Sequence, residues 1–296
     1  MNISKFNPYP EYRLEQWSSL RIQLLWAYQK QGNLPQAIDL MDYHFQSAAL
    51  VIKGWAKVGT DTQAEQLAKP GQWLIFKQGQ RRQQFSSDCE LLSIVYRFQL
   101  PTGQAFYDAG LPLIFEAADA PGLETEARKV LPLMERHVAA GFLRSQQVLD
   151  MREYMLTQNA LRSFLLELTA VLHAKGVHPY AMNEGAPQVA QALGIINAAE
   201  VPELGKSVTS ASIAKQVSLS LTHLERLMVA ETARTVFQHI DARKLQTAQD
   251  ALLVDHDSMK AIAYSLGFSS PAHFNSWFKK RTQMTPLQFR RRGSLG

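Results

Sequence analysis

Short hydrophobic runs separated by turn residues dominate residues 45–98, and this pattern predicts antiparallel strands. The runs are Ala48–Trp55, Trp73–Phe76 and Leu91–Phe98, of which the last is rich in branched and aromatic side chains. Glycine, serine and aspartate fill the intervals. We therefore expect a small barrel or sandwich in this part of the chain. The stretch Leu14–Gln31 fits a helix and a strand equally well.

From Gly122 onward the hydrophobic period becomes helical. Spacings of three and four residues alternate from Met151 to Leu172, with one polar break at Gln158. The series is Met151, Tyr154, Gln158, Leu161, Leu165, Leu168 and Leu172. It is typical of a helix that pairs with a second copy and equally of a helix packed on its own domain. A linker is favoured next by Gly176, Pro179, Gly185 and Pro187.

Residues 209–227 follow the hydrophobic pattern of a helix-turn-helix unit. The inward positions and the turn are Ile213, Ala214, Val217, Ser218, Leu219, Leu224 and Leu227. A small residue such as Ala214 is needed where the two helices cross, and Thr209 and Ser220 are candidate helix caps. The second helix then presents Leu221, Thr222, Glu225 and Arg226 outward. In this motif the outward face of the second helix enters the major groove of DNA.

The same pattern recurs about fifty residues later. The first helix and turn are repeated by Ile262, Ala263, Leu266, Gly267 and Phe268, with Ser258 and Ser270 as caps. Phe274, Trp277 and Phe278 fill the inward positions of the second helix, one position later than in the first copy. Its outward residues are Ala272, His273, Asn275 and Ser276, and the adjacent cations Lys279, Lys280 and Arg281 suit phosphate contacts. The candidate DNA-binding residues are the outward residues of both second helices together with Ser220, Ser270, Lys279 and Lys280. Two such units in tandem are a much stronger signal than one.

Charge separates the two parts of the chain. Of 296 residues, 31 are Lys or Arg and 26 Asp or Glu, which gives a net charge of +5. Residues 1–185 hold 18 of each sign, whereas residues 186–296 hold 13 basic and 8 acidic residues. No acidic residue follows Asp257. A neutral part joined to a basic part predicts one domain that meets a polyanion and another with a separate task.

The second unit carries a family resemblance. The residues Ile262-Ala263-x-x-Leu266-Gly267-Phe268-Ser269-Ser270-x-x-x-Phe274-x-x-x-Phe278, followed by Thr285-Pro286-Leu287-x-Phe289-Arg290, resemble the signature of AraC/XylS-type transcription regulators. Upstream residues from Ser220 to Leu227 and from Lys244 to Leu252 fit the same family. The resemblance covers residues 186–296 and implies an all-helical domain whose two recognition helices enter successive major grooves of DNA.

Four positions depart from the family pattern. Ala233 and Gln283 stand where the family usually has helix-ending glycines, so we expect those helix ends to be built differently. Ser276 replaces the usual basic residue on the outer face of the second recognition helix, which puts base reading by that helix in doubt. Lys244 replaces an arginine in the connecting helix, a milder change.

Family members of this length often carry a cupin-like barrel that binds a small effector and helps dimerisation. The segment Leu67–Gly79 is similar to a hairpin of that barrel. No cluster of histidines accompanies it, since His44 is the only histidine in the strand-rich region, so we expect no metal site and no cofactor. Candidate effector-binding residues are Trp55, Trp73, Phe76, Arg81, Arg82 and Tyr96, with the arginines suited to an anionic ligand. The aromatic side chains fit a plain barrel core as well.

These observations predict an α+β multidomain protein. A cupin-like β-rich domain spans residues 1–140, a helical linker and candidate dimer helix spans 141–185, and an all-α DNA-binding domain with two helix-turn-helix units spans 186–296. We expect a cytoplasmic, non-enzymatic transcription regulator, of the activator type. Its expected partners are double-stranded DNA, a small-molecule effector, RNA polymerase and a second copy of itself.

Two alternatives remain open from the sequence. In the first alternative, the N-terminal domain of the regulator binds a protein in place of a small molecule. In the second, an enzyme domain is fused to the DNA-binding module. An alkyl-repair enzyme of that kind needs several cysteines, and the chain has only Cys89. One cysteine also excludes an intramolecular disulfide and favours a reducing compartment. The chain has no apolar stretch long enough to span a membrane, so we expect no membrane partner.

Overall fold

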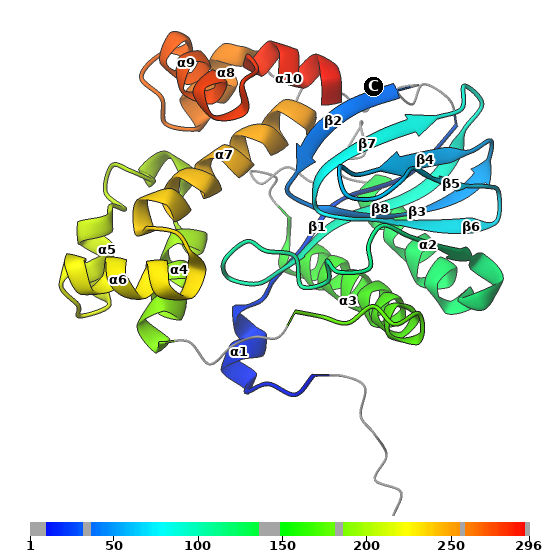
Figure 1. Cartoon of the computed structure of the whole chain (residues 1–296), viewed down its shortest axis with the longest axis horizontal. Coiled ribbons are helices and arrows are strands. Elements are labelled where there is room, and N and C mark those ends of the chain that lie inside the picture. The colour runs from blue at the N-terminus through cyan, green and yellow to red at the C-terminus, as the bar shows by residue number, and fades with distance from the viewer. Residues whose placement is uncertain (1–9, 32–36, 136–148, 181–185, 255–257, 294–296) are drawn as a thin grey trace, which may run out of the picture. The chain divides into compact units, whose positions relative to one another are not determined.

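The chain divides into two compact units, residues 1–182 and 183–295 (Figure 1). The structure is a computed structural model that describes residues 10–31, 37–135, 149–180, 186–254 and 258–293. Nine strands lie in the described part of the first unit, and the described elements of the second unit are all helical. Both the β-rich N-terminal domain and the all-α C-terminal domain are therefore as predicted. The finer domain limits at residues 140 and 185 stay predictions.

The strands of the first unit form two antiparallel sheets. The five-stranded sheet has the order β1 (Arg21–Gln31), β8 (Glu90–Gln99), β3 (Gln46–Lys53), β6 (Gln72–Phe76) and β9 (Leu113–Glu116). The four-stranded sheet has the order β2 (Ala37–Tyr43), β7 (Gly79–Phe85), β4 (Ala56–Gly59) and β5 (Gln66–Ala68). Closure of these strands into one barrel stays a prediction.

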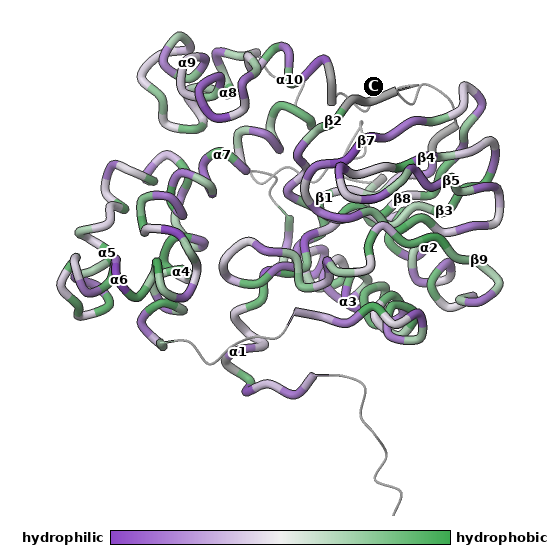
Figure 2. Tube along the Cα trace, viewed as in Figure 1, coloured by the Kyte–Doolittle hydropathy of each residue, from purple (hydrophilic) through white to green (hydrophobic). Residues whose placement is uncertain are grey.

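The burial of each strand reflects what covers it. Strand β7 alternates between buried and exposed residues, so Arg81, Gln83 and Phe85 face inward. Strand β8 is buried along almost its whole length, because helices contact its sheet as well. Figure 2 shows the largely hydrophobic character of β3 and β8. The space between the two sheets is thus the interior of this unit.

Three α-helices and a 3₁₀ turn accompany the sheets: α1 (Leu14–Ser19), η1 (Ala117–Asp119), α2 (Pro121–Glu135) and α3 (Met151–Ala174). Residues 14–31, which the sequence left undecided, contain both a helix and a strand, since α1 ends at extended Leu20 and β1 follows. Helix α3 packs on α2 and β1 through the later part of its hydrophobic series. Its buried members are Leu161, Leu165, Leu168 and Leu172, whereas Met151 and Tyr154 are exposed.

The second unit consists of seven described α-helices and one 3₁₀ turn. They are α4 (Pro187–Ala198), η2 (Val201–Glu203), α5 (Ser210–Gln216), α6 (Leu221–Thr232), α7 (Val236–Val254), α8 (Met259–Ser265), α9 (Pro271–Thr282) and α10 (Pro286–Gly293). One core cluster joins α4, α5, α6 and the start of α7. The long helix α7 also contacts α8 and α10, so it connects the two helix pairs α5–α6 and α8–α9.

Candidate nucleic-acid interface

Both predicted helix-turn-helix units are present, and each begins its helices at the predicted caps. The Thr209 hydroxyl accepts from Ser212 N–H at 3.2 Å, and the Ser220 hydroxyl accepts from His223 N–H at the same distance. In the second helix-turn-helix unit, the Ser258 hydroxyl accepts from Ala261 N–H at 3.1 Å and the Ser270 hydroxyl accepts from His273 N–H at 3.2 Å. Each hydroxyl satisfies a backbone donor that the first turn of a helix leaves unpaired.

The turns of the two units differ by one residue. Ser218 in the first turn and Gly267 in the second both have left-handed backbone, with φ of 57° and 78°. Ser269 is an additional residue between Gly267 and the following cap, which explains why the inward residues of α9 come one position later. Ala214 and Ala263 are both buried where the paired helices cross. An added Cβ at Gly267 would lie 2.8 Å from Pro202, so the glycine also allows η2 to pack close.

The inward faces of α6 and α9 match residue for residue at an offset of fifty. Leu224 and Met228 are fully buried in the first helix, as Phe274 and Phe278 are in the second. Leu227, an inward position in the sequence prediction, is only partly buried and packs at the edge of the core. The missed inward residue is Met228, which follows Leu224 by one helical turn and could have been found from that spacing.

On α6 the structure separates the four outward residues into two groups. Leu221, Thr222 and Arg226 are exposed. Glu225 is half-buried, and its carboxylate accepts a hydrogen bond from Val236 N–H at 3.0 Å. Glu225 therefore caps the start of α7, which leaves Arg226 as the long outward donor on this helix.

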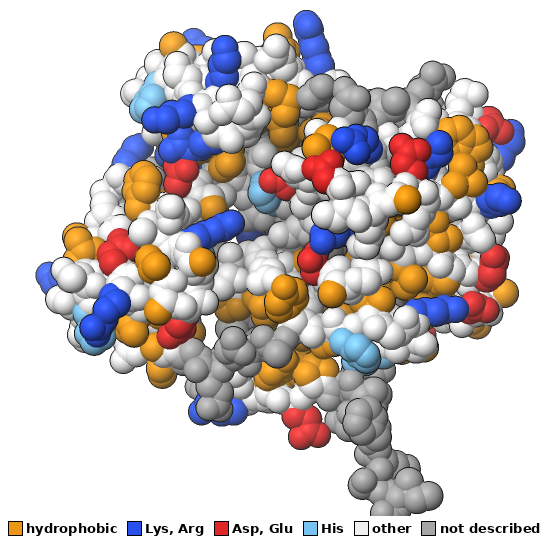
Figure 3. Space-filling view, viewed as in Figure 1, with side chains coloured by type: hydrophobic (Ala, Val, Ile, Leu, Met, Phe, Trp, Pro, Cys, Tyr) orange, Lys and Arg blue, Asp and Glu red, His pale blue; other side chains and the backbone are white. Residues whose placement is uncertain are grey.

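On α9 the predicted outward residues share one exposed surface. This surface consists of Ala272, His273, Asn275, Ser276, Lys279 and Lys280. The ring of His273 packs edge-on against Phe268 with centroids 5.3 Å apart, so the start of α9 is held against its own turn. Lys and Arg side chains gather over the α7–α10 part of the unit (Figure 3).

Arg281 forms an ion pair within the C-terminal unit. Its Nε and Nη2 donate to the two carboxylate oxygens of Asp241 at 2.5 and 2.6 Å, and its guanidinium lies 4.6 Å from the ring of Trp277. The sequence prediction grouped Arg281 with Lys279 and Lys280 as a phosphate contact, and this ion pair argues against that role. For the exposed residues Lys279 and Lys280 this role stays a prediction.

Burial lowers the pKa of two titratable side chains in α7. Desolvation lowers the pKa of His239 to about 4, with the nearby charge of Arg234 as a smaller cause, and the ring nitrogen lies 2.8 Å from the Thr232 hydroxyl. Desolvation also lowers the pKa of Lys244, whose ammonium lies 4.5 Å from the ring of Phe268. Lys244 thus packs on the turn of the second helix-turn-helix unit.

The candidate effector-binding residues of the first unit fall into two groups. Arg81, Trp73, Phe76 and Tyr96 are buried, and the Arg81 guanidinium lies 5.0 Å from Phe76 across the two sheets. Trp55 is half-buried and Arg82 is exposed, where Arg82 pairs with Asp61 at 3.4 Å. Strand alternation places Arg82 on the opposite face of β7 from Arg81, so the two arginines do not share a site.

Arg81 is a buried cation held among aromatic rings. Only 1% of the residue is exposed, and its guanidinium lies 4.1 Å from Tyr43 and 5.6 Å from Phe45. One amino group donates to the Lys77 carbonyl, and Nε has no hydrogen-bond partner among the described residues. Desolvation lowers the pKa of Arg81 to about 10, which still leaves it charged at neutral pH.

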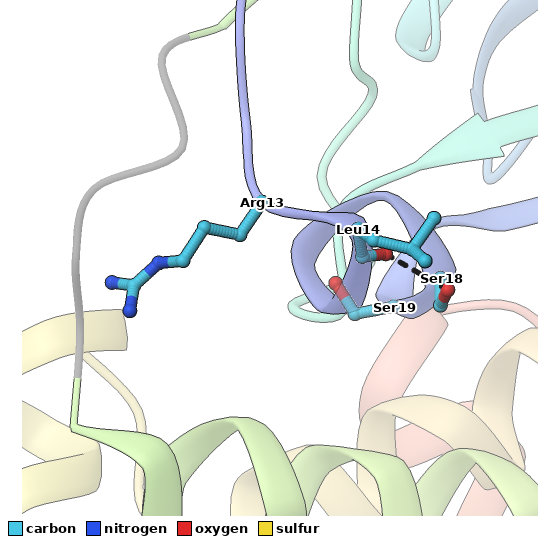
Figure 4. Close-up of a pocket in the computed structure, with 4 residues that line it drawn as sticks. All are labelled: Arg13, Leu14, Ser18 and Ser19. Carbon is cyan, nitrogen blue, oxygen red and sulfur yellow. Dashed lines mark hydrogen bonds between the residues drawn. The ribbon is translucent and has the colours of Figure 1, made fainter.

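A separate depression lies beside α1 and is lined by Arg13, Leu14, Ser18 and Ser19 (Figure 4). The Ser18 hydroxyl donates to the Leu14 carbonyl at 2.9 Å, as in an ordinary helical turn.

Within the described residues no group of three or more His, Cys, Asp or Glu side chains is placed to hold a metal ion. The helices of the described part include none long and apolar enough to cross a membrane.

Comparison with known proteins identifies the class of the C-terminal unit. Residues 213–292 match the family model of a helix-turn-helix domain. The chain is 33% identical over 84 residues to the probable transcription factor PqrA of Proteus vulgaris, which covers 28% of this chain and 69% of PqrA. It is 30% identical over 152 residues to the HTH-type transcriptional regulator GlxA of Rhizobium meliloti, covering 49% of this chain and 46% of GlxA. The chain belongs to the AraC/XylS-type transcription regulators.

The chain is also similar to a further transcription regulator and to a solved structure. The HTH-type transcriptional activator RhaS of Escherichia coli is 32% identical over 79 residues, which is 27% of this chain and 28% of RhaS. The chain thus spans less than half the length of GlxA and RhaS. A solved structure of ToxT from Vibrio cholerae aligns over 92% of this chain and 98% of that chain, with a TM-score of 0.44 and 11% identity.

Proposed function

We propose that this protein is a sequence-specific DNA-binding transcription regulator that responds to a small molecule. The observation that carries the proposal is the pair of helix-turn-helix units, each with a capped second helix and an exposed outward face. All of the net positive charge of the chain lies in the same part, residues 186–296. The proposal includes no catalytic step, and it locates the protein in the cytoplasm, where it meets double-stranded DNA.

The outward side chains suggest unequal reading by the two helices. Arg226 on α6 is the long donor suited to O6 and N7 of guanine, with Thr222 beside it. On α9, His273 and Asn275 are the candidate base contacts, while Lys279 and Lys280 meet phosphate, which positions the protein without reading sequence. The Ser220 and Ser270 hydroxyls set where the two helices begin. The second half-site of the operator should therefore tolerate base changes better than the first.

The proposal is tested by selecting duplexes from a randomised pool with the full-length chain. We expect a bipartite consensus with its parts about one helical turn apart, and an affinity that falls steeply with salt as counterions are released. Scrambled duplexes of equal length serve as the control. Recovery of no consensus, with equal affinity for selected and scrambled duplexes, would contradict the proposal.

The effector is an anionic molecule with an apolar body, bound at Arg81 between the two sheets. Burial of the Arg81 charge is costly, and the nearby Asp42 charge and the aromatic rings offset only part of that cost. A carboxylate that accepts from the free Nε would supply the missing partner, and the rings of Tyr43 and Phe76 suit an apolar body. A protein ligand for this unit is the alternative, and it does not explain an inward-facing cation.

Thermal unfolding in the presence of sodium benzoate and sodium octanoate tests this assignment, with octan-1-ol as a neutral counterpart. At least one carboxylate should raise the melting temperature of the wild type and of the Arg82→Met control, but not of Arg81→Met. Because Arg82 is exposed and paired with Asp61, the control removes a cation from the opposite face of β7. An equal shift for Arg81→Met, or no shift in any protein, would count against the anionic effector.

The regulator is also proposed to act as a homodimer and to contact RNA polymerase as an activator. Helix α3 supports the first part, because its exposed face carries large apolar side chains: Met151, Met155 and Leu166, exposed by 78%, 53% and 66%. A second copy would bury them. Sedimentation equilibrium should give a dimer for the wild type and a monomer for Met155→Glu. Transcription in vitro with added polymerase tests the activator role.

A further inference from the structure

Helix α7 holds both recognition helices through carboxylates. Near its start, Val236 N–H donates to Glu225 of α6. Further along, Asp241 accepts from Arg281 and Trp277 of α9. We propose that Asp241 is a positioning residue for DNA recognition, which fixes the orientation of α9 and so the placement of its exposed surface against the duplex. The inference rests on the proposed DNA-binding function.

The contacts around Asp241 leave the second recognition helix little freedom. Arg281 makes a two-pronged ion pair with the carboxylate, and the Trp277 indole N–H donates to the same carboxylate at 3.2 Å. The remaining guanidinium nitrogen, Nη1, donates to the Trp277 carbonyl at 3.1 Å. The Arg281 and Asp241 side chains are 23% and 24% exposed, so the pair is partly shielded from water. A bidentate fork of this kind fixes direction as well as distance.

This arrangement links the interior of the unit to the DNA-facing surface of α9. Trp277 and Arg281 lie one helical turn apart and share the face that packs toward α7. Ser276 and Lys280 immediately precede them and lie on the exposed side. A rotation of α9 about its axis would break the ion pair and move the exposed side chains together. The carboxylate therefore acts on DNA contacts through Arg281 and Trp277 and not by touching DNA.

Among the described residues, an ion pair of this kind is found in the second helix-turn-helix unit (α8–α9) and not in the first (α5–α6). At the offset of fifty residues, Trp277 and Arg281 correspond to Leu227 and Glu231 of α6, and Asp241 corresponds to Gln191 of α4. A Leu, a Glu and a Gln at these positions cannot form the same two-pronged ion pair. The link between α6 and α7 is instead the hydrogen bond from Val236 N–H to Glu225. Loss of Asp241 should thus affect the part of the operator bound by α9.

A competing interpretation treats Arg281 as a phosphate contact and Asp241 as an incidental neighbour. The two interpretations predict opposite signs for Asp241→Asn. If Arg281 met phosphate, removing a nearby negative charge would free a cation and strengthen binding. If Asp241 positions α9, the same substitution loosens the helix and weakens binding.

The experiment measures binding of full-length variants to a duplex selected with the wild type, over a series of salt concentrations. Asp241→Asn should bind roughly tenfold more weakly, within the range of couplings found between contacting side chains, with the salt slope unchanged. Arg281→Lys should also bind more weakly, because a lysine cannot replace the bidentate fork. Lys280→Gln is the matched control for a phosphate contact and should reduce the salt slope by about one. The double variant Asp241→Asn/Arg281→Lys should be no weaker than either single variant.

The opposite results would overturn the inference. They are tighter binding by Asp241→Asn, wild-type binding by Arg281→Lys, or additive losses in the double variant. A measurement without DNA separates this failure from failure of the proposed function: the Trp277 indole N–H resonance, assigned with Trp277→Phe, should shift in Asp241→Asn while the fold is retained. If the wild type itself binds no selected duplex, the DNA-binding proposal fails, whereas an unshifted indole resonance contradicts the positioning contact alone.

Discussion

Two helix ends of the DNA-binding unit should become more stable on substitution by glycine. Ala233 ends α6 and Gln283 ends α9, both with left-handed backbone at φ of 56° and 59°. A residue with a Cβ pays about 1–2 kcal/mol for this conformation, and glycine avoids that cost. Glycine also makes the unfolded chain more flexible, which returns about 0.4–1 kcal/mol. The net gain expected from each substitution is therefore about 0.5–1 kcal/mol.

The two gains should add, because the sites lie at the ends of different helices and share no partner. Urea unfolding of a fragment comprising residues 183–296 measures them, since this compact unit has its own core. The matched control is Ala230→Gly, an identical chemical change at an exposed position inside α6. There the backbone is helical, and glycine should destabilise by about 0.5–1 kcal/mol.

The two alanine substitutions should shift the urea midpoint in opposite directions. Ala233→Gly should raise the urea midpoint, and Ala230→Gly should lower it. If both substitutions lowered the midpoint by similar amounts, the left-handed backbone at Ala233 would not be a source of strain. The same result at Gln283 would also remove the link between these residues and the glycines usual in the family.

Three further predictions concern single side chains. Because the folded pKa of His239 is about 4 and lies below its ordinary value of 6.5, its contribution to stability is complete above about pH 6.5 and is lost as the pH falls toward 4. Urea titrations between these pH values should show a loss of at most about 3 kcal/mol that His239→Phe abolishes. Arg226→Ala should weaken operator binding by about 1–3 kcal/mol and relax one base position, whereas uniform weakening on every duplex would assign Arg226 to phosphate. Gly267→Ala should cost about 2 kcal/mol or more in urea unfolding, since the added Cβ meets Pro202 in a left-handed backbone; an unchanged midpoint would contradict that close contact.

The sequence carried enough local information to predict the helix-turn-helix units in detail. A cap depends on one hydroxyl and the backbone three residues later, so Thr209, Ser220, Ser258 and Ser270 could be placed without knowing the fold. Inward positions of a helix likewise follow from spacing. The prediction omitted Met228, which is buried one helical turn after Leu224, and named Leu227, which is only partly buried at the edge of the core.

Contacts between distant residues could not be predicted from pattern. Glu225 has the spacing of an outward residue, yet it accepts a hydrogen bond from Val236 N–H of α7. Arg281 follows the inward Trp277 by one helical turn, but its spacing does not show that Asp241 of α7 is its partner. The helix ends at Ala233 and Gln283 adopt the left-handed backbone in spite of lacking glycine. The expectation that these helix ends are built differently is wrong, because each helix ends in the left-handed conformation that a glycine would adopt.

For the candidate effector site, the sequence could not show which arginine faces the interior. Strand alternation in β7 indicates that Arg81 and Arg82 point to opposite faces, but not which of them faces the interior. Only the pairing of β7 with its neighbours and the position of Phe76 in the other sheet identify Arg81 as the buried cation. Residues 14–31 had no single period because a short helix and a strand follow one another there.

We propose that the C-terminal unit alone recognises DNA, and binding measurements on two separate fragments test this proposal. Residues 183–296 should bind the duplex selected by the full-length chain, with an affinity that falls steeply as salt is raised. Residues 1–182, in which acidic and basic residues nearly balance, should not bind it. Binding by residues 1–182 together with no binding by residues 183–296 would show that DNA recognition does not lie in the C-terminal unit.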